Sequence, residues 1–165
     1  MNKQITKITI GAVLAALSVV IRMVFDPIMP DNFNVPFYSI PLIIAGFMIG
    51  RTYGLVVGIV ADTAMGLMSP YGYKPLFVFS SIAWSLLPAL LTKEPKGYRW
   101  YLIIIITYFT AFLFNTMAMW IHYSKNFAMA SFYLRLGLII PFSFIIAYLT
   151  YFIYERVYKD IVLTK

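Results

Sequence analysis

Long runs of hydrophobic residues, separated by short polar breaks, make up most of the chain. Within these runs apolar and polar residues do not alternate as they do in the strands of a membrane barrel, so helices are the structure expected to cross a bilayer. The pattern predicts an all-α integral membrane protein with a single six-helix domain over residues 1–165. Its transmembrane helices are expected at about residues 5–25, 37–50, 53–68, 75–91, 100–121 and 127–158.

Turn-forming and charged residues mark the ends of the hydrophobic runs. Asp26-Pro27 opens a polar loop after the first run, and residues 50–52 and 69–72 have turn chemistry. Lys3 and Lys7, before the first run, imitate a signal peptide. No small-residue cleavage site follows them, whereas further apolar segments do, so we expect the first helix to be retained.

The basic residues are distributed unevenly between the two sides of the predicted bundle. With the N-terminus inside, the outer loops hold only Lys74 and Lys125. The cytoplasmic segments then hold Lys3, Lys7, Arg51, Lys93, Lys96, Arg99, Arg156, Lys159 and Lys165. Because positive charge concentrates in cytoplasmic loops, this bias predicts that both termini are cytoplasmic. It also accounts for most of the net charge of +7, so no nucleic acid is expected as a partner.

The composition excludes a water-soluble globular enzyme. Hydrophobic residues make up 62% of the chain and charged residues 12%, against roughly 45–50% and ~25% in soluble domains. There is no cysteine and only one histidine. The chain also lacks a Gly-rich phosphate loop, a His-Glu-x-x-His motif and a Gly-x-Ser-x-Gly motif. We therefore expect a non-catalytic chain that holds neither a metal nor a cofactor.

Ionisable side chains inside the predicted helices are the first candidates for function, because a charge within a bilayer is costly. Arg22, Asp62 and Arg135 all fall in the outer half of the predicted spans, which indicates one outward-facing polar pocket. Two other interpretations stay open: Asp62 pairs with an arginine inside the protein, or the arginines extend outward to the headgroups.

Further residues at the same outer end extend the candidate site. Asn115 and His122 share one face of the fifth predicted helix, and aromatic rings in the outer loops can stack against a flat ligand. The candidate substrate-binding residues are Arg22, Asp62, Tyr71, Tyr73, Lys74, Phe77, Asn115, Trp120, His122 and Arg135.

Small residues recur at helical spacing in two of the predicted helices. Gly54, Gly58, Asp62 and Gly66 lie four residues apart on one stripe of the third helix, where another helix can approach closely. In the first helix, the small residues pair as Gly11 with Ala15 and Ala12 with Ala16. These pairs indicate either packing within the chain or docking on a partner subunit.

Several stretches resemble the substrate-binding S components of energy-coupling-factor (ECF) vitamin transporters. The resemblance covers nearly the whole chain and includes Ala12-Val13-Leu14-Ala15-Ala16 and Gly54-Leu55-Val56-Val57-Gly58-Ile59-Val60-Ala61-Asp62. The folate-specific members are the most similar, through residues 67–75, Phe114-Asn115-Thr116 and Leu134-Arg135-Leu136.

This resemblance implies a multi-pass protein of a prokaryotic plasma membrane that captures a vitamin, folate above all, from outside. Delivery inward would require a transmembrane T component and two ATP-binding subunits, docked on the small residues Gly11, Ala12, Ala15 and Ala16. For folate, Asp62 would accept hydrogen bonds from the pterin, and Arg22, Arg135 or Lys74 would hold the glutamate tail.

Three alternatives stay open at this stage. The first is an S component for another vitamin, such as riboflavin, biotin or pantothenate. The second is a homodimeric small-solute transporter driven by protons through Asp62. The third is an intramembrane enzyme, which the missing nucleophile and base disfavour.

Overall fold

The computed structural model describes residues 3–29, 35–70 and 72–163, with side chains up to residue 156, and all the regular structure in these ranges is helical. The α-helices are α1 (Lys3–Phe25), α2 (Ser39–Met48), α3 (Arg51–Leu67), α4 (Val78–Leu91), α5 (Gly97–His122), α6 (Lys125–Ala130) and α7 (Phe132–Leu163). A 3₁₀ turn, η1 (Pro75–Phe77), precedes α4. The predicted all-α class is therefore confirmed over the part of the chain that the structure describes.

The last predicted helix, residues 127–158, is divided in the structure into α6 and α7. The Oγ of Ser124 accepts a hydrogen bond from the N–H of Phe127 at 3.2 Å and so caps α6. At Ser131 the backbone leaves the helical conformation, and α7 begins directly afterwards. Pro88 and Pro141, by contrast, lie inside continuous helices.

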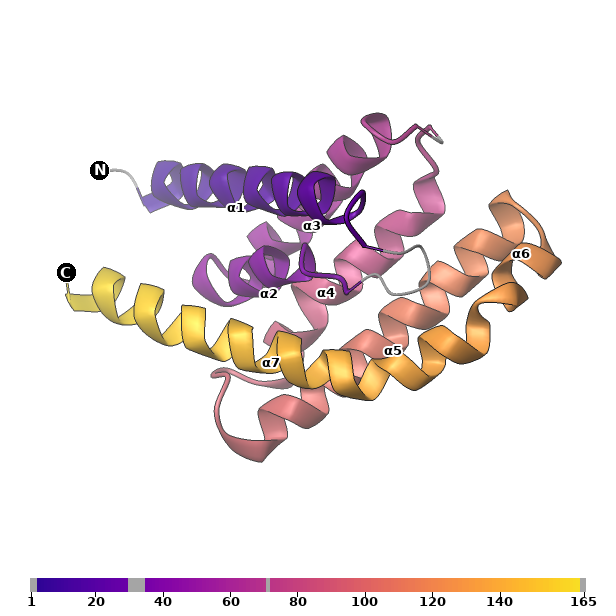
Figure 1. Cartoon of the computed structure of the whole chain (residues 1–165). Coiled ribbons are helices and arrows are strands. Elements are labelled where there is room, and N and C mark those ends of the chain that lie inside the picture. The colour runs from indigo at the N-terminus through magenta and orange to yellow at the C-terminus, as the bar shows by residue number, and fades with distance from the viewer. Residues whose placement is uncertain (1–2, 30–34, 71, 164–165) are drawn as a thin grey trace.

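Over the residues that the structure describes, three helices are long and apolar enough to cross a membrane: α1, α5 and the Phe132–Arg156 part of α7. The ten residues of α2 extend about 15 Å at ~1.5 Å per residue, half of a hydrocarbon core ~30 Å thick. Six crossings therefore stay a prediction. The start of α1 and the end of α7 lie at the same side of the molecule, and α6 lies at the opposite side (Figure 1).

Glycine and serine residues bring α2, α3 and α4 into close contact. A Cβ added to Gly54 would lie 2.8 Å from the Cα of Gly46, and one added to Gly58 would lie 2.5 Å from the Oγ of Ser85. The helices can approach this closely only because these side chains are absent or small. One turn further along α3 and one turn earlier in α4, this contact places Asp62 beside Ser81.

Aromatic residues fix α5 and α7 against this group. The indole Nε1–H of Trp100 in α5 donates to the carbonyl oxygen of Ala147 in α7 at 2.9 Å, and both residues are buried. The ring of Phe47 at the end of α2 packs edge-on against Trp100, with ring centroids 5.6 Å apart. These contacts hold the start of α5 against α7 and the end of α2.

Candidate binding pocket

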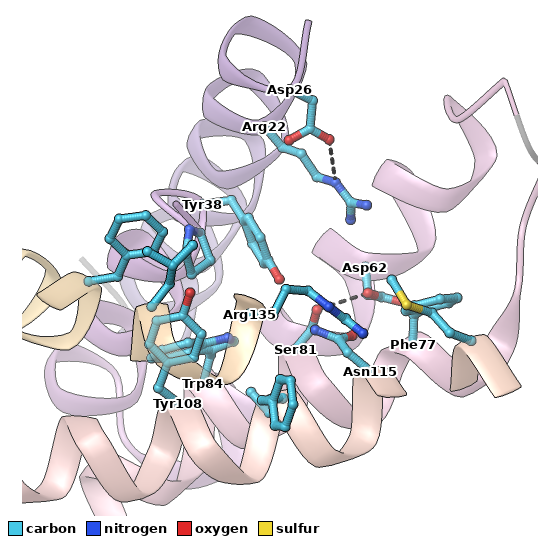
Figure 2. Close-up of a pocket in the computed structure, with 16 residues that line it drawn as sticks. Arg22, Asp26, Tyr38, Asp62, Phe77, Ser81, Trp84, Tyr108, Asn115 and Arg135 are labelled. Carbon is cyan, nitrogen blue, oxygen red and sulfur yellow. Dashed lines mark hydrogen bonds and ion pairs between the residues drawn. The ribbon is translucent and has the colours of Figure 1, made fainter. Parts of the chain in front are cut away.

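A cavity of about 220 Å³ lies among α1, α3, α4, α5 and α7, together with the turn before α2 (Figure 2). Five of the ten residues predicted for the site line it: Arg22, Asp62, Phe77, Asn115 and Arg135. These residues come from five separate segments of the chain. The structure thus brings together the ionisable residues that the sequence placed in the predicted helices.

Asp62 is the buried carboxylate of the cavity, with 4% of the residue exposed. Its Oδ1 accepts a hydrogen bond from the Oγ of Ser81 at 2.8 Å (Figure 2). Within the described part of the chain Asp62 forms no ion pair. A buried carboxylate without an ion-pair partner interacts strongly with any hydrogen-bond donor that enters.

Arg22 lies at one edge of the cavity and is already paired. Its Nε donates to Asp26 Oδ2 at 3.0 Å, and its Nη1 lies 3.8 Å from the sulfur of Met65. The guanidinium also faces the ring of Tyr38, 5.4 Å from its centroid. The Arg22 and Asp26 side chains are more than a third exposed. Their charges therefore compensate each other at the edge of the cavity, and Arg22 does not neutralise Asp62 by an ion pair.

Arg135 presents the second uncompensated charge. Its Nη2 donates to the carbonyl oxygen of Ala128 at 3.2 Å, and the guanidinium lies 5.5 Å from the ring centroid of Phe112. Its Nε is buried and makes no hydrogen bond. Since a buried unsatisfied donor costs free energy, this group favours an acceptor supplied by a ligand.

Aromatic rings form part of the wall of the cavity. Trp84 and Tyr108 pack against each other with ring centroids 5.3 Å apart, and both line the cavity. Asn115 adds an amide that both donates and accepts hydrogen bonds. The arrangement suits a flat, polar molecule with hydrogen-bond donors for Asp62 and an acceptor for Arg135.

Four other predicted residues lie around the cavity without lining it. The ring of Tyr73 covers Gly66, the Nζ of Lys74 lies 4.7 Å from the centroid of Tyr123, and Trp120 is exposed. His122 stacks on Phe77 with ring centroids 6.3 Å apart, and its Nε2 is buried without a hydrogen bond. Tyr71, the tenth, lies outside the described residues.

Several residues that line the cavity were not predicted as site residues. Tyr108 and Phe112 precede Asn115 on the same face of α5, so extending the Asn115 stripe towards the N-terminus would have found them. Tyr38 is one of the aromatic residues in the first predicted outer loop. Ser81 and Trp84 lie within an apolar run, where the sequence carries no signal that separates them from packing residues.

The four small residues of α1 divide into two faces. Gly11 and Ala15 are buried, and a Cβ added to Gly11 would lie 3.1 Å from Cγ2 of Val57 in α3. Ala12 and Ala16 are exposed. Gly11 and Ala15 therefore pack within the chain, and only the other pair is available to a partner.

Comparison with known families connects this architecture with transport. Residues 6–158 match the family described as ECF transporter, substrate-specific component. The chain belongs to this family. Searches of curated proteins and of solved structures gave no match. As an ECF S component, the protein is a non-catalytic transport subunit of the prokaryotic plasma membrane. Family membership further implies a vitamin-type substrate and the ECF module as partner.

Proposed function

We propose that this S component captures its vitamin in the cavity lined by Asp62 and Arg135, and that folate is the vitamin. The observation that carries the proposal is the pair of charges that the chain leaves uncompensated on an aromatic-walled cavity. A buried carboxylate and a half-buried guanidinium are costly in a membrane protein unless something binds them. A ligand with both a donor edge and an acceptor satisfies both groups.

The chemistry of a pterin matches these groups. A pterin presents a ring N–H beside an amino group, and one carboxylate can accept both hydrogen bonds. This role is proposed for Asp62, with Ser81 holding one of its oxygens. Arg135 is proposed to bind an oxygen of the ligand, and Trp84 and Tyr108 to contact the ring faces.

We propose that different parts of folate lie in different places, because the cavity is small. Its 220 Å³ lies below the roughly 300–1,000 Å³ typical of pockets for drug-sized ligands. The pterin is therefore proposed to fill the cavity while the glutamate tail extends to its edge. There Arg22 would exchange Asp26 for a tail carboxylate, because an arginine holds a carboxylate through two parallel hydrogen bonds.

The predicted orientation of the protein supports capture from outside. Arg135, which lines the cavity, donates to the Ala128 carbonyl of α6, and α6 lies opposite the start of α1 and the end of α7 (Figure 1). With six crossings and cytoplasmic termini, as the distribution of lysine and arginine predicts, the cavity faces outward. Energy for release inward would come from the ATP-binding subunits of the ECF module.

Mass spectrometry of the ligand that copurifies with the chain tests the vitamin directly. Tryptophan fluorescence titrations with folate, riboflavin, biotin and pantothenate follow, since Trp84 lines the cavity. We expect folate to bind tightest. If one of the other three vitamins binds more tightly, that vitamin takes the place of folate in the proposal, and the proposed pocket is unchanged.

Two substitutions test the pocket itself. Asp62→Asn and Arg135→Ala each remove a charged hydrogen-bonding group, which is worth about 1.5–3 kcal/mol, or roughly 10- to 150-fold in affinity. Arg99→Gln, at an exposed position near the start of α5, is the matched control and should leave affinity unchanged. Wild-type affinity in both pocket variants would exclude this cavity as the binding site.

A further inference from the structure

Phe77 lines the cavity from the short 3₁₀ turn that precedes α4 (Figure 2). This turn, η1, has three residues, and none of them is buried. The backbone hydrogen bond from the N–H of Phe77 to the carbonyl oxygen of Lys74 is 3.3 Å long. A single 3₁₀ turn has poor hydrogen-bond geometry and little stability of its own. The placement of the Phe77 ring therefore depends on contacts with other elements.

The end of α5 supplies these contacts. The imidazole of His122, the last residue of α5, stacks on the Phe77 ring with 17° between the ring planes and 6.3 Å between the centroids. The Nζ of Lys74, directly before η1, lies 4.7 Å from the ring centroid of Tyr123, the residue after His122. Two consecutive residues of the chain thus attach both ends of the turn to α5.

His122 contacts Phe77 and does not line the cavity itself. Because the two rings are nearly parallel, the imidazole covers one face of the phenyl ring. The Nε2 of His122 is buried, and within the described residues it makes no hydrogen bond. Ring packing therefore holds the imidazole at this place, and the contact that the structure assigns to the side chain is the stack on Phe77.

We propose that His122 is a positioning residue for vitamin binding, which holds the Phe77 ring at the wall of the cavity. The inference rests on the proposed function, because it needs the cavity to be the binding site. Phe77 contacts a ring of the bound vitamin, and His122 acts through Phe77 without touching the vitamin. Since the stack places Phe77 before the vitamin arrives, binding does not have to order this side chain, and affinity is higher.

Three substitutions at His122 test the role of its ring. Tryptophan fluorescence measures affinity for folate, or for riboflavin, biotin or pantothenate if one of these binds more tightly. An aromatic pair contributes roughly two- to tenfold, so His122→Ala should weaken binding by that factor. His122→Phe keeps a flat ring and should restore affinity to within about twofold of the wild type. His122→Gln keeps a polar side chain without a ring and should bind as weakly as His122→Ala.

A double-mutant cycle with Phe77→Ala tests whether His122 acts through Phe77. If it does, the variant with alanine at both positions binds as weakly as Phe77→Ala alone, because the second change removes a contact already lost. If the two losses in affinity multiply, His122 contacts the vitamin itself and the proposal is overturned. Recovery of affinity by His122→Gln but not by His122→Phe would assign a hydrogen bond to His122 and also overturns it.

A stacked pair on α7 provides the matched control. The rings of Tyr148 and Phe152 lie 6.4 Å apart with 18° between their planes, both are exposed, and neither lines the cavity. Tyr148→Ala therefore removes a stack of the same geometry and should leave affinity unchanged.

Asp62→Asn, measured in the same titration, separates this proposal from the proposed function. Loss of affinity in Asp62→Asn with wild-type affinity in His122→Ala overturns the positioning role and retains the pocket. Wild-type affinity in both variants overturns the positioning role and the pocket together. A lower unfolding temperature of His122→Ala with unchanged affinity would make the stack purely structural, which again overturns the proposal.

Discussion

Asp62 and Ser81 form the best-defined polar contact of the cavity. Both side chains are buried where α3 and α4 approach, and the hydroxyl donates to the carboxylate at 2.8 Å. The hydroxyl fixes one carboxylate oxygen and leaves the other to accept from a ligand. Ser81 is therefore a positioning residue for Asp62 and need not touch the ligand itself.

Ser81→Ala should weaken vitamin binding about fivefold, because a net hydrogen bond of this kind contributes about 1 kcal/mol. Binding weakens because Asp62 loses its preferred orientation, although its charge remains. Isothermal titration with the copurified vitamin measures the change. Thr110→Ala is the control, since it also removes one hydroxyl hydrogen bond. The Oγ1 of Thr110 donates to the Ile106 carbonyl at an exposed position of α5. Equal affinity in Ser81→Ala and wild type would show that Asp62 needs no positioning.

At the same scale, the sequence predicts charged site residues better than neutral ones. Arg22, Asp62 and Arg135 stand out because a charge in a hydrophobic run needs a reason, and all three line the cavity. Ser81 and Trp84 do not stand out, because serine and tryptophan occur in transmembrane helices for packing alone. Their role depends on which helices meet, and this is a property of the tertiary structure.

At the scale of the elements, the hydrophobic runs predict the approximate bounds of the helices, except at the division between α6 and α7. Hydrophobic runs and turn residues indicate α1 to α5 to within a few residues. The division between α6 and α7 was missed, because Ser131 lies in an apolar stretch without glycine or proline. A single serine that ends one helix cannot be distinguished by sequence from a serine within a helix.

The contact between α2 and α3 depends on backbone proximity. In Gly54→Ala the new Cβ would lie 2.8 Å from the Cα of Gly46, and backbone cannot move aside as a flexible side chain can. We expect a loss of about 1–3 kcal/mol in stability, seen as a lower unfolding temperature in detergent.

Gly137→Ala is the matched control for this substitution. It lies in α7 with no atom within 4 Å of the added Cβ, so it should be neutral or stabilise by up to about 1 kcal/mol. Equal stability of the two alanine variants would contradict the close α2 and α3 contact.

At the scale of the whole molecule, the two sides differ in the polar residues that they present. The polar cavity includes Arg135, which donates to a carbonyl of α6, and the exposed cations Lys3 and Arg156 lie near the start of α1 and in the last part of α7, at the other side (Figure 1). In our proposal the substrate is received at the side of the cavity, while the partners that hydrolyse ATP act from the other side. This division requires that the two sides face different compartments.

Introduced cysteines measure that orientation directly, because the natural chain contains none. Lys125→Cys at the start of α6 should react with an impermeant maleimide on intact cells. Lys93→Cys, exposed between α4 and α5, should react only after the cells are permeabilised. The opposite labelling pattern would invert the orientation and place the cavity at the cytoplasmic side.

The resemblance to ECF S components implies that small residues of α1 dock a partner subunit, and we propose this role for the exposed pair, Ala12 and Ala16. The double variant Ala12→Leu and Ala16→Leu adds bulk to the exposed face of α1 and changes no residue that lines the cavity. We expect unchanged vitamin affinity and at least tenfold slower ATP-driven uptake in proteoliposomes that contain the complete transporter. A close helix contact tolerates no such bulk, because small residues set the distance between the backbones.

Two further variants determine whether slower uptake depends on where the bulk is added or on added bulk alone. Ala130→Leu enlarges an exposed alanine in α6, at the opposite side, and should leave uptake unchanged. Ala15→Leu enlarges a buried alanine of α1 and should lower the unfolding temperature instead, since it overpacks the chain's own core. Normal uptake by the Ala12 and Ala16 double variant would move docking to another face. Loss of vitamin affinity in that variant would show that α1 couples the two sides even before a partner binds.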